Sequence, residues 1–130
     1  MMAVLRITAV VNFLHREDGG RLLPACDSPS YRPHLVVENQ AQGSASVRDN
    51  DAPAERYLGI QFTGDGREML PGVEHEVRMD LLYSPKVDYS GLVRGATFTI
   101  REGGRTVGFG RVLRQPERQG GGQQRGSDGP

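Results

Sequence analysis

Apolar and polar residues alternate with a period of two in several short segments of this chain, and this alternation restricts the fold more than any other feature. From Val4 to Leu14 apolar residues occupy every second position, with Arg6, Thr8 and Asn12 between them. Successive side chains of a strand point to opposite faces, so the pattern is typical of a strand with one buried face. A helix would need apolar residues three and four positions apart, and the chain lacks that spacing.

Other segments of the same character follow along the chain. We expect further strands at His34–Glu38, Tyr57–Thr63, Val73–Tyr83, Thr97–Arg101 and Thr106–Leu113. The 18 glycines and 8 prolines favour strands joined by tight turns over long helices. Six antiparallel strands of this length can close into a barrel that has no exposed edge and is filled by its inward side chains. The sequence therefore predicts an all-β fold, a small six-stranded antiparallel closed β-barrel without a ligand cavity.

Glycine pairs mark two of the expected reversals. Gly19 and Gly20 predict a tight turn after the first strand, because glycine readily adopts positive φ. Glu102-Gly-Gly-Arg105 predicts a hairpin with a primed turn, positive φ at both glycines, and a cross-strand pair between the glutamate and the arginine. In the strand that follows, Gly108 and Gly110 predict the close approach of another backbone.

The length of 130 residues is enough for one domain with a modest core. We assign residues 1–114 to the barrel. Residues 115–130 consist mainly of Gln, Gly and Arg with no apolar anchor, which predicts a disordered C-terminal tail. Two connections are long, residues 39–56 and residues 86–94. The segment Pro24–Pro33 contains three prolines and predicts irregular structure.

Charge and cysteine content limit the classes of function. The formal net charge is zero, which argues against strong non-specific binding to nucleic acid, although residues 86–130 hold eight basic and four acidic side chains. No stretch has the length of a transmembrane helix, and no secretory signal is evident. The single cysteine, Cys26, cannot form an internal disulfide. We therefore expect a cytoplasmic protein that does not contact a membrane.

No pattern of catalytic or metal-ligating residues is present. His15, His34 and His75 do not stand at metal-ligand spacing with each other or with Cys26. His75 falls in the apolar row of its strand and is expected to pack in the core or at an interface. Cys26 has no basic neighbour in sequence that would favour a thiolate. We expect no enzyme activity, no metal, no cofactor and no small-molecule substrate.

Four motifs together resemble one known family. The run from Gly95 to Val112 includes Phe-Thr-Ile-Arg-Glu-Gly-Gly-Arg-Thr-Val-Gly-Phe-Gly, and it is similar to the closing hairpin of elongation factor Tu. Glu17-Asp-Gly-Gly-Arg21, Tyr31-Arg-Pro33 and Met69-Leu-Pro-Gly72 are similar, in order and spacing, to three further motifs of that family. The resemblance covers about Val4 to Leu113 and implies the third, C-terminal β-barrel domain of elongation factor Tu, standing alone. The chain has no phosphate-binding Gly-x-x-x-x-Gly-Lys-Ser/Thr loop, so GTP hydrolysis by the family's mechanism is not expected.

The resemblance implies a translation-related binding module. In the family this domain contacts the T stem of tRNA and docks on the GTPase domain and on protein partners. The residues of this chain that match its RNA-contacting motifs, with their neighbours in the turn, are the candidate RNA- or partner-binding residues: Arg21, Glu102, Gly103, Gly104 and Arg105. Two positions depart from the family, where Leu22 replaces a histidine and Ser84 replaces a lysine.

Two alternatives stay open at this point. Glu102–Arg105 is explained either by RNA contact or by turn chemistry alone, and Arg21 either by a phosphate contact or by a surface position beside a turn. The whole domain could instead be a protein-interaction scaffold with no RNA role. Its partner would then be met through residues 39–56 and 86–94.

Overall fold

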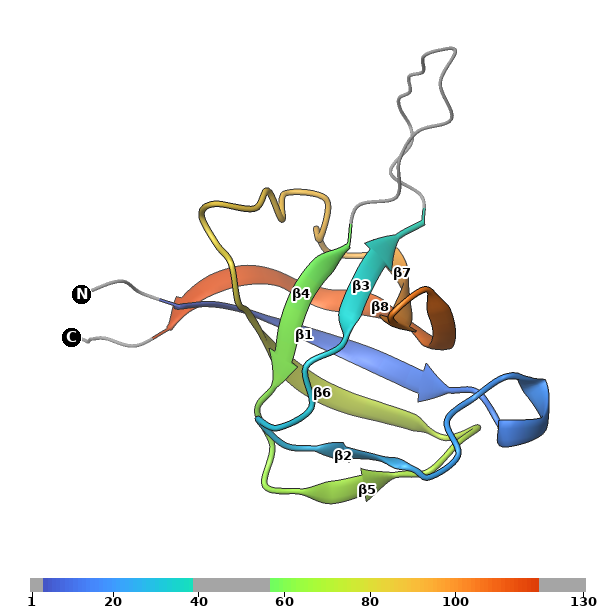
Figure 1. The fold of residues 1–130 in the computed structure, drawn as a ribbon. Helices are drawn as coiled ribbons and strands as arrows, with labels where there is room; N and C mark the ends of the chain where they lie inside the picture. Colours follow the sequence, from blue (N-terminus) through green and yellow to red (C-terminus); the bar gives the residue numbers. More distant parts are fainter. Residues whose placement is uncertain (1–3, 39–56, 120–130) are drawn as a thin grey trace, which may run out of the picture.

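A computed structural model describes residues 4–38 and 57–119 of the chain. It contains eight strands and one short 3₁₀ helix (Figure 1). In chain order these are β1 (Val4–Phe13), η1 (Arg16–Asp18), β2 (Ala25–Asp27), β3 (His34–Val37), β4 (Leu58–Phe62), β5 (Arg67–Met69), β6 (Glu74–Leu81), β7 (Thr97–Glu102) and β8 (Arg105–Gln119). The expected loop at residues 39–56 lies outside the described residues. None of the described helical structure has the length and apolar character needed to cross a membrane.

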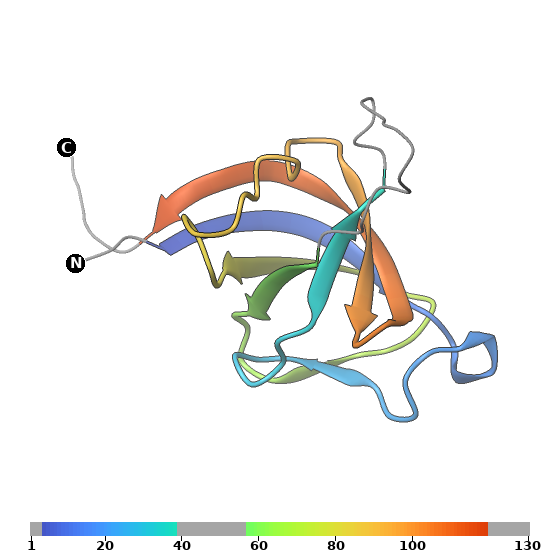
Figure 2. The ribbon, with the colours of Figure 1, turned by 45° about the horizontal axis from the view of Figure 1, so that its top comes forward.

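Six of the strands form a closed barrel in the order β1-β6-β4-β3-β7-β8, and every pair is antiparallel. The first and last strands of the barrel complete the ring by pairing with each other, as Figure 2 shows. These six strands coincide with the six that alternation predicts. The predicted fold class is therefore confirmed.

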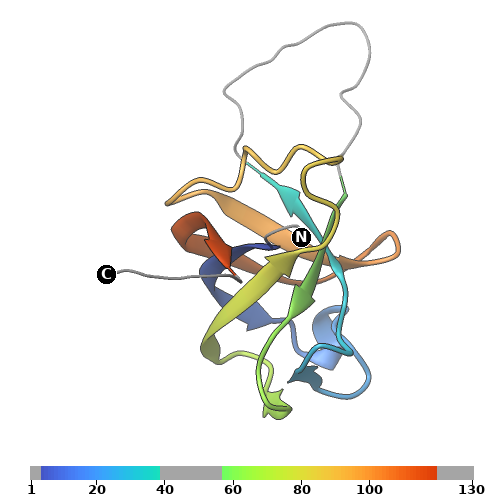
Figure 3. The same ribbon diagram turned by 90° about the vertical axis from the view of Figure 1, so that its left-hand side faces the viewer.

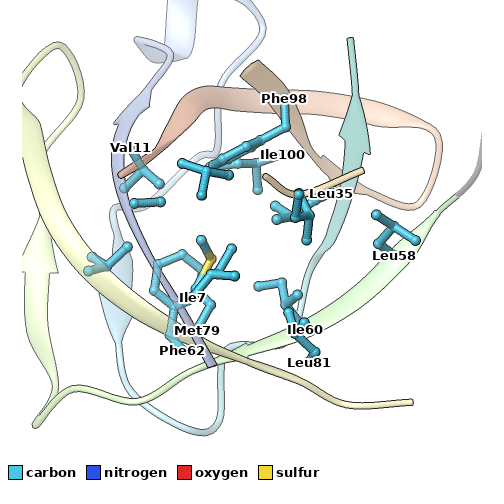
Figure 4. Close-up of a cluster of buried hydrophobic side chains, with 14 of the residues drawn as sticks. Ile7, Val11, Leu35, Leu58, Ile60, Phe62, Met79, Leu81, Phe98 and Ile100 are labelled. Carbon is cyan, nitrogen blue, oxygen red and sulfur yellow. The ribbon is translucent and has the colours of Figure 1, made fainter. Parts of the chain in front are cut away.

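The inward side chains fill the barrel, and Figure 4 shows them converging from all sides. Ile7, Ala9, Val11 and Phe13 of β1 are at most 3% exposed, as their alternation predicts. Large side chains from the other five strands of the ring are also almost fully buried: Leu35, Ile60, Phe62, Met79, Phe98, Ile100, Val107 and Val112. Burial of these apolar surfaces is the main force that holds the barrel together.

The expected inward row of Val73–Tyr83 is confirmed only in its centre. Val77, Met79 and Leu81 are buried, and His75 is half-buried. Val73 and Tyr83 are 48% and 53% exposed, because they lie beyond the ends of β6 at Glu74 and Leu81.

Beside the barrel lies a two-stranded sheet that alternation does not reveal. β2 and β5 pair in register Ala25↔Met69 to Asp27↔Arg67 (Figure 1). β2 lies in Pro24–Pro33, the segment expected to be irregular, and no strand was expected at β5. Asp27 is only 5% exposed, and its Oδ1 accepts a hydrogen bond of 3.0 Å from the Gly64 amide. The Gly66 amide donates to the Asp27 carbonyl at 2.8 Å. These bonds satisfy the polar groups of a sheet that is too short to show a period of its own.

The connection between β6 and β7 is part of the barrel's core. Figure 3 shows this segment crossing one end of the barrel. Leu92 is 0% exposed and Tyr89 is 5% exposed, and both belong to the main hydrophobic cluster. The Tyr89 hydroxyl donates to the Gly59 carbonyl at 2.7 Å and accepts from the Tyr83 amide at 3.0 Å. Residues 86–94 therefore seal the end of the barrel.

The last strand is longer than expected. β8 continues to Gln119, whereas the predicted domain boundary falls after residue 114. The backbone of residues 117–119 pairs with that of β1, in register Arg6↔Glu117 and Val4↔Gln119. A backbone ladder does not depend on apolar side chains, which is why a composition of Gln, Pro, Glu and Arg concealed it. Residues 120–130, the rest of the predicted tail, lie outside the described residues.

Candidate functional site

The turn at the end of the β7–β8 hairpin is glycine-tipped and exposed. Glu102 and Arg105 face each other in the ladder, with Gly103 and Gly104 between them. Gly103 has φ 64°, whereas Gly104 is not in the left-handed region. Positive φ is therefore needed at one of the two glycines and not at both, which corresponds to a type II′ turn. No heavy atom beyond the chain neighbours would lie within 4 Å of a Cβ on either residue, so the tip projects into open space.

Glu102 is paired with Arg21 and not with the arginine opposite it in the hairpin. Arg21 Nε lies 2.6 Å from Glu102 Oε2, and both side chains are about one-third exposed. Arg21 Nη1 also donates to the Leu23 carbonyl at 2.8 Å. The expected cross-strand pair between Glu102 and Arg105 is thus replaced by a contact between residues 81 positions apart in sequence. The guanidinium of Arg21 is held by two fixed acceptors.

Tyr31 connects this ion pair to the core. Its hydroxyl donates to Glu102 Oε2 at 2.7 Å, and the Arg21 guanidinium lies over its ring, 5.2 Å from the centroid. The same ring packs against Phe62 and Phe13, with centroids 5.1 and 6.2 Å apart. Burial, together with the hydrogen bond to Glu102, raises the pKa of Tyr31. Tyr31 therefore stays protonated and fixes the direction of the carboxylate.

Arg105 fastens the hairpin to the loop after β1. Its Nη2 donates to the Gly20 carbonyl at 2.7 Å and its Nε to the Gly19 carbonyl at 3.2 Å. Of the two glycines in that loop, Gly19 has φ 98° and caps η1, so the expected positive φ is found at one position. Gly20 is buried, and a Cβ there would lie 2.0 Å from the Leu14 carbonyl oxygen. This close approach holds the residue before Arg21 against the backbone that follows β1.

The structure brings all five sequence-predicted site residues together at one end of the barrel. The residue that the prediction left out is Tyr31, which the sequence analysis named only as part of the Tyr31-Arg-Pro33 motif. The matching Tyr-Arg-Pro motif was a signal of its importance, but its role as a hydrogen-bond donor depends on a tertiary contact. Arg21 and Arg105 bring two positive charges to the cluster and Glu102 one negative charge. Arg16, Glu17 and Asp18 of η1 are exposed nearby, so the local field is close to neutral.

An apolar surface borders this cluster. Leu22 and Leu23 are 66% and 71% exposed and directly follow Arg21. Leu70 is 52% exposed and follows Met69, which pairs with Ala25 of β2. These leucines thus lie at the same end of the two-stranded sheet.

The remaining candidate residues are dispersed. Cys26 is exposed on β2, and His15 is exposed beside Gly72. His75 Nε2 is 3.2 Å from the Leu70 carbonyl. Among the residues that the structure describes, the buried Nδ1 of His34 has no hydrogen-bond partner. Residues 4–38 and 57–119 contain no group of three or more His, Cys, Asp or Glu side chains that could hold a metal ion.

No protein-family model matches the sequence. The arrangement itself offers a rigid, glycine-tipped projection flanked by two oriented guanidinium groups and an exposed apolar edge.

Proposed function

We propose that this domain is a non-enzymatic binding module that contacts RNA, with tRNA as the expected class, through the β7–β8 turn and the Arg21 loop. One observation carries the proposal: a turn with two exposed glycines lies between two arginines that are already held in position. Backbone amides and arginine side chains are common partners of phosphate oxygens. A cytoplasmic location belongs to the same proposal, since the single cysteine cannot form an internal disulfide and suits a reducing compartment. A translation-related role belongs to it because of the resemblance to elongation factor Tu.

The hydrogen bonds of the two arginines leave donors for a ligand. Arg21 uses Nε and Nη1 within the protein, and Arg105 uses Nε and Nη2. A guanidinium has five N–H donors, so each side chain can also face a phosphate. Because both side chains are fixed before binding, little conformational entropy is lost when RNA is bound.

The resemblance to the third domain of elongation factor Tu supports the same surface. In that family the residues matched by Arg21, Glu102 and Gly103 meet the T stem of tRNA. A separate GTPase or another translation protein is a further expected partner. Glu17 and Asp18 are exposed beside the cluster, so binding would depend on a few positioned contacts more than on a strong positive field.

A charge at the tip of the turn tests this function. A side chain at Gly104 would point into open space, and the residue has no positive φ, so Gly104→Glu and Gly104→Gln should both fold. Using an RNA hairpin that mimics a T stem, we expect Gly104→Glu to weaken binding at least tenfold more than its neutral match. Affinity should also fall with salt, with a logarithmic slope of about −2 for two neutralised phosphates. Equal affinities of the two variants, or no binding at low salt, would refute RNA contact at this turn.

The exposed leucines favour a second candidate, a protein-interaction domain without an RNA role. Leu22 and Leu23 stand next to Arg21, and large apolar side chains at this exposure are typical of a partner surface when they are grouped. The test is capture of partners from lysate in RNase-treated and untreated halves, with wild type and with Leu22→Ser/Leu23→Ser. A protein that is retained after RNase and lost with the double variant supports this candidate. Loss of all captured protein after RNase excludes it.

A further inference from the structure

The outer face of β8 carries an exposed aromatic ring and two exposed arginines in a row. Phe109 is 47% exposed, and its ladder partners are Asn12 of β1 and Thr99 of β7. Both partners are polar and uncharged. An exposed phenylalanine between two polar neighbours is a single apolar ring, without the cluster of apolar side chains that forms the core of a protein interface.

Arg111 is the next outward residue along the strand. It is exposed and lies between Val10 and Thr97, neither of which has a charge to offer it. Arg114 is also exposed and lies opposite Thr8. The distance along β8 from Phe109 to Arg114 is about 17 Å at the rise of a strand.

A third arginine joins this row from the neighbouring segment. The Gly95 amide donates to the Val112 carbonyl, and the Val112 amide donates to the Ala96 carbonyl, which continues the β7–β8 ladder beyond β7. Arg94 therefore comes next to Arg114, and together they line an open concavity of about 430 Å³. The concavity is completed by Leu113, Gln115 and Glu117.

The charge of this face is not balanced within the described part of the chain. Among the residues that line the concavity with Arg94 and Arg114, Glu117 is the one acid. Within residues 4–38 and 57–119, none of the three arginines makes an ion pair or a side-chain hydrogen bond. By contrast, Arg6, on the neighbouring strand β1, is bound to Asp80 at 2.6 Å. Three close positive charges repel one another, and a bound polyanion would relieve that repulsion.

We propose that this face, defined by Phe109, Arg111, Arg114 and Arg94, binds single-stranded nucleic acid. A base stacks on Phe109, and the backbone phosphates follow the arginines along β8. Aromatic side chains beside a positively charged track are the usual means by which β-barrels hold single strands. An acidic protein could form ion pairs with the arginines equally well. It would not explain the isolated aromatic ring of Phe109 between a threonine and an asparagine.

This proposal goes beyond the function proposed for the β7–β8 turn and does not depend on it. The turn offers backbone contacts to a folded stem, whereas the β8 face offers stacking to unpaired bases. The two surfaces share no residue, so each can fail alone.

Fluorescence anisotropy with a short labelled oligouridylate and the full chain tests the proposal. The variants are Phe109→Leu, which removes the aromatic face, and Arg111→Gln/Arg114→Gln, which removes two charges. Arg16→Gln/Arg32→Gln removes the same charge from exposed positions elsewhere and serves as the matched control. Gly104→Glu serves as the control for the turn. Thermal unfolding of each variant confirms that the barrel is intact.

We expect Phe109→Leu to weaken binding about fivefold or more without changing its salt dependence. The double arginine variant should weaken binding and reduce the logarithmic salt slope by about 1.4, that is, by two phosphates. Both controls should bind as wild type does. Absence of binding at about 50 mM salt overturns the proposal. An equal loss of affinity in the Arg16→Gln/Arg32→Gln control also overturns it. If Phe109→Leu binds as wild type does and polyglutamate competes fully for the site, the face is a surface for acidic proteins and the proposal is overturned.

Discussion

At the scale of single residues, the two glycines of the β7–β8 turn have different roles. Gly103 has φ 64° and Gly104 does not have positive φ, while a Cβ on either residue would meet no neighbouring atom within 4 Å. Steric conflict with neighbours therefore cannot contribute to the effect of an alanine at either position. We expect Gly103→Ala to lower the free energy of unfolding by about 1–2 kcal/mol, from backbone strain alone. Gly104→Ala is the matched control and should change it by less than about 0.5 kcal/mol. Urea denaturation of both variants measures the difference, and equal losses would contradict it.

Tyr31 makes stability depend on pH in the alkaline range. Burial and the hydrogen bond to Glu102 raise its pKa above the ordinary value of 10.0, so the folded state holds the hydroxyl proton more tightly than the unfolded chain does. Its stabilising contribution is therefore complete below pH 10 and declines as the pH rises above that value. Tyr89, whose pKa burial also raises, acts in the same direction.

Removal of the Tyr31 hydroxyl separates the contribution of Tyr31 to this pH dependence from that of Tyr89. Tyr31→Phe keeps the ring contacts with Phe13 and Phe62 but loses the donor to Glu102, which should cost about 1 kcal/mol near neutral pH. Between about pH 8 and pH 11 the variant should lose less stability than wild type. Chemical denaturation at the two pH values measures this, and parallel losses in both proteins would show that Tyr31 does not contribute to the pH dependence.

At the scale of elements, alternation predicted the longer strands that have one buried face and missed the two shortest strands. β2 and β5 have three residues each, too few to show a period, and Asp27 stabilises them through contacts distant in sequence. The end of β8 was missed because the backbone pairing of residues 117–119 with β1 leaves no alternation of apolar residues in the sequence. In the candidate site, the turn was predictable from its glycines. The partner of Glu102 was not, since Arg21 stands 81 positions away and Arg105 stands directly opposite.

The burial of residues 86–94 changes the role that we assign to this segment. As a long connection it suggested a loop for a protein partner, but Tyr89 and Leu92 seal the barrel. Leu92→Ala should therefore cost about 2–5 kcal/mol, the range for a fully buried leucine. Its neighbour Val93 is 50% exposed, and Val93→Ala should cost less than about 0.5 kcal/mol. Thermal unfolding of the pair measures the contrast. A stable Leu92→Ala variant would show that this segment is not part of the core.

At the scale of the whole molecule, the barrel depends on the contact between its first and last strands. Gly110 of β8 lies opposite Val11, with the Phe98 ring packed against it. A Cβ at Gly110 would lie 2.4 Å from the Val10 carbonyl oxygen and 2.6 Å from the Phe98 ring. The first of these atoms belongs to a backbone and cannot rotate away. β1 and β8 would have to separate, or the core would have to shift.

Because the pairing of β1 with β8 closes the barrel, we expect a substitution that separates these two strands to destabilise every strand of the barrel. We expect Gly110→Ala to lower the free energy of unfolding by about 1–3 kcal/mol, the range for overpacking. Gly108, in the same strand, would bring its Cβ no closer than 2.9 Å to the Asn12 carbonyl, so Gly108→Ala should cost less. Hydrogen exchange should show faster exchange in β1 and β8 of the Gly110 variant first, and then in the remaining barrel strands, since a barrel opened at one seam acquires two exposed edges. If exchange changed only beside Gly110, barrel closure would not be the step that unites the fold.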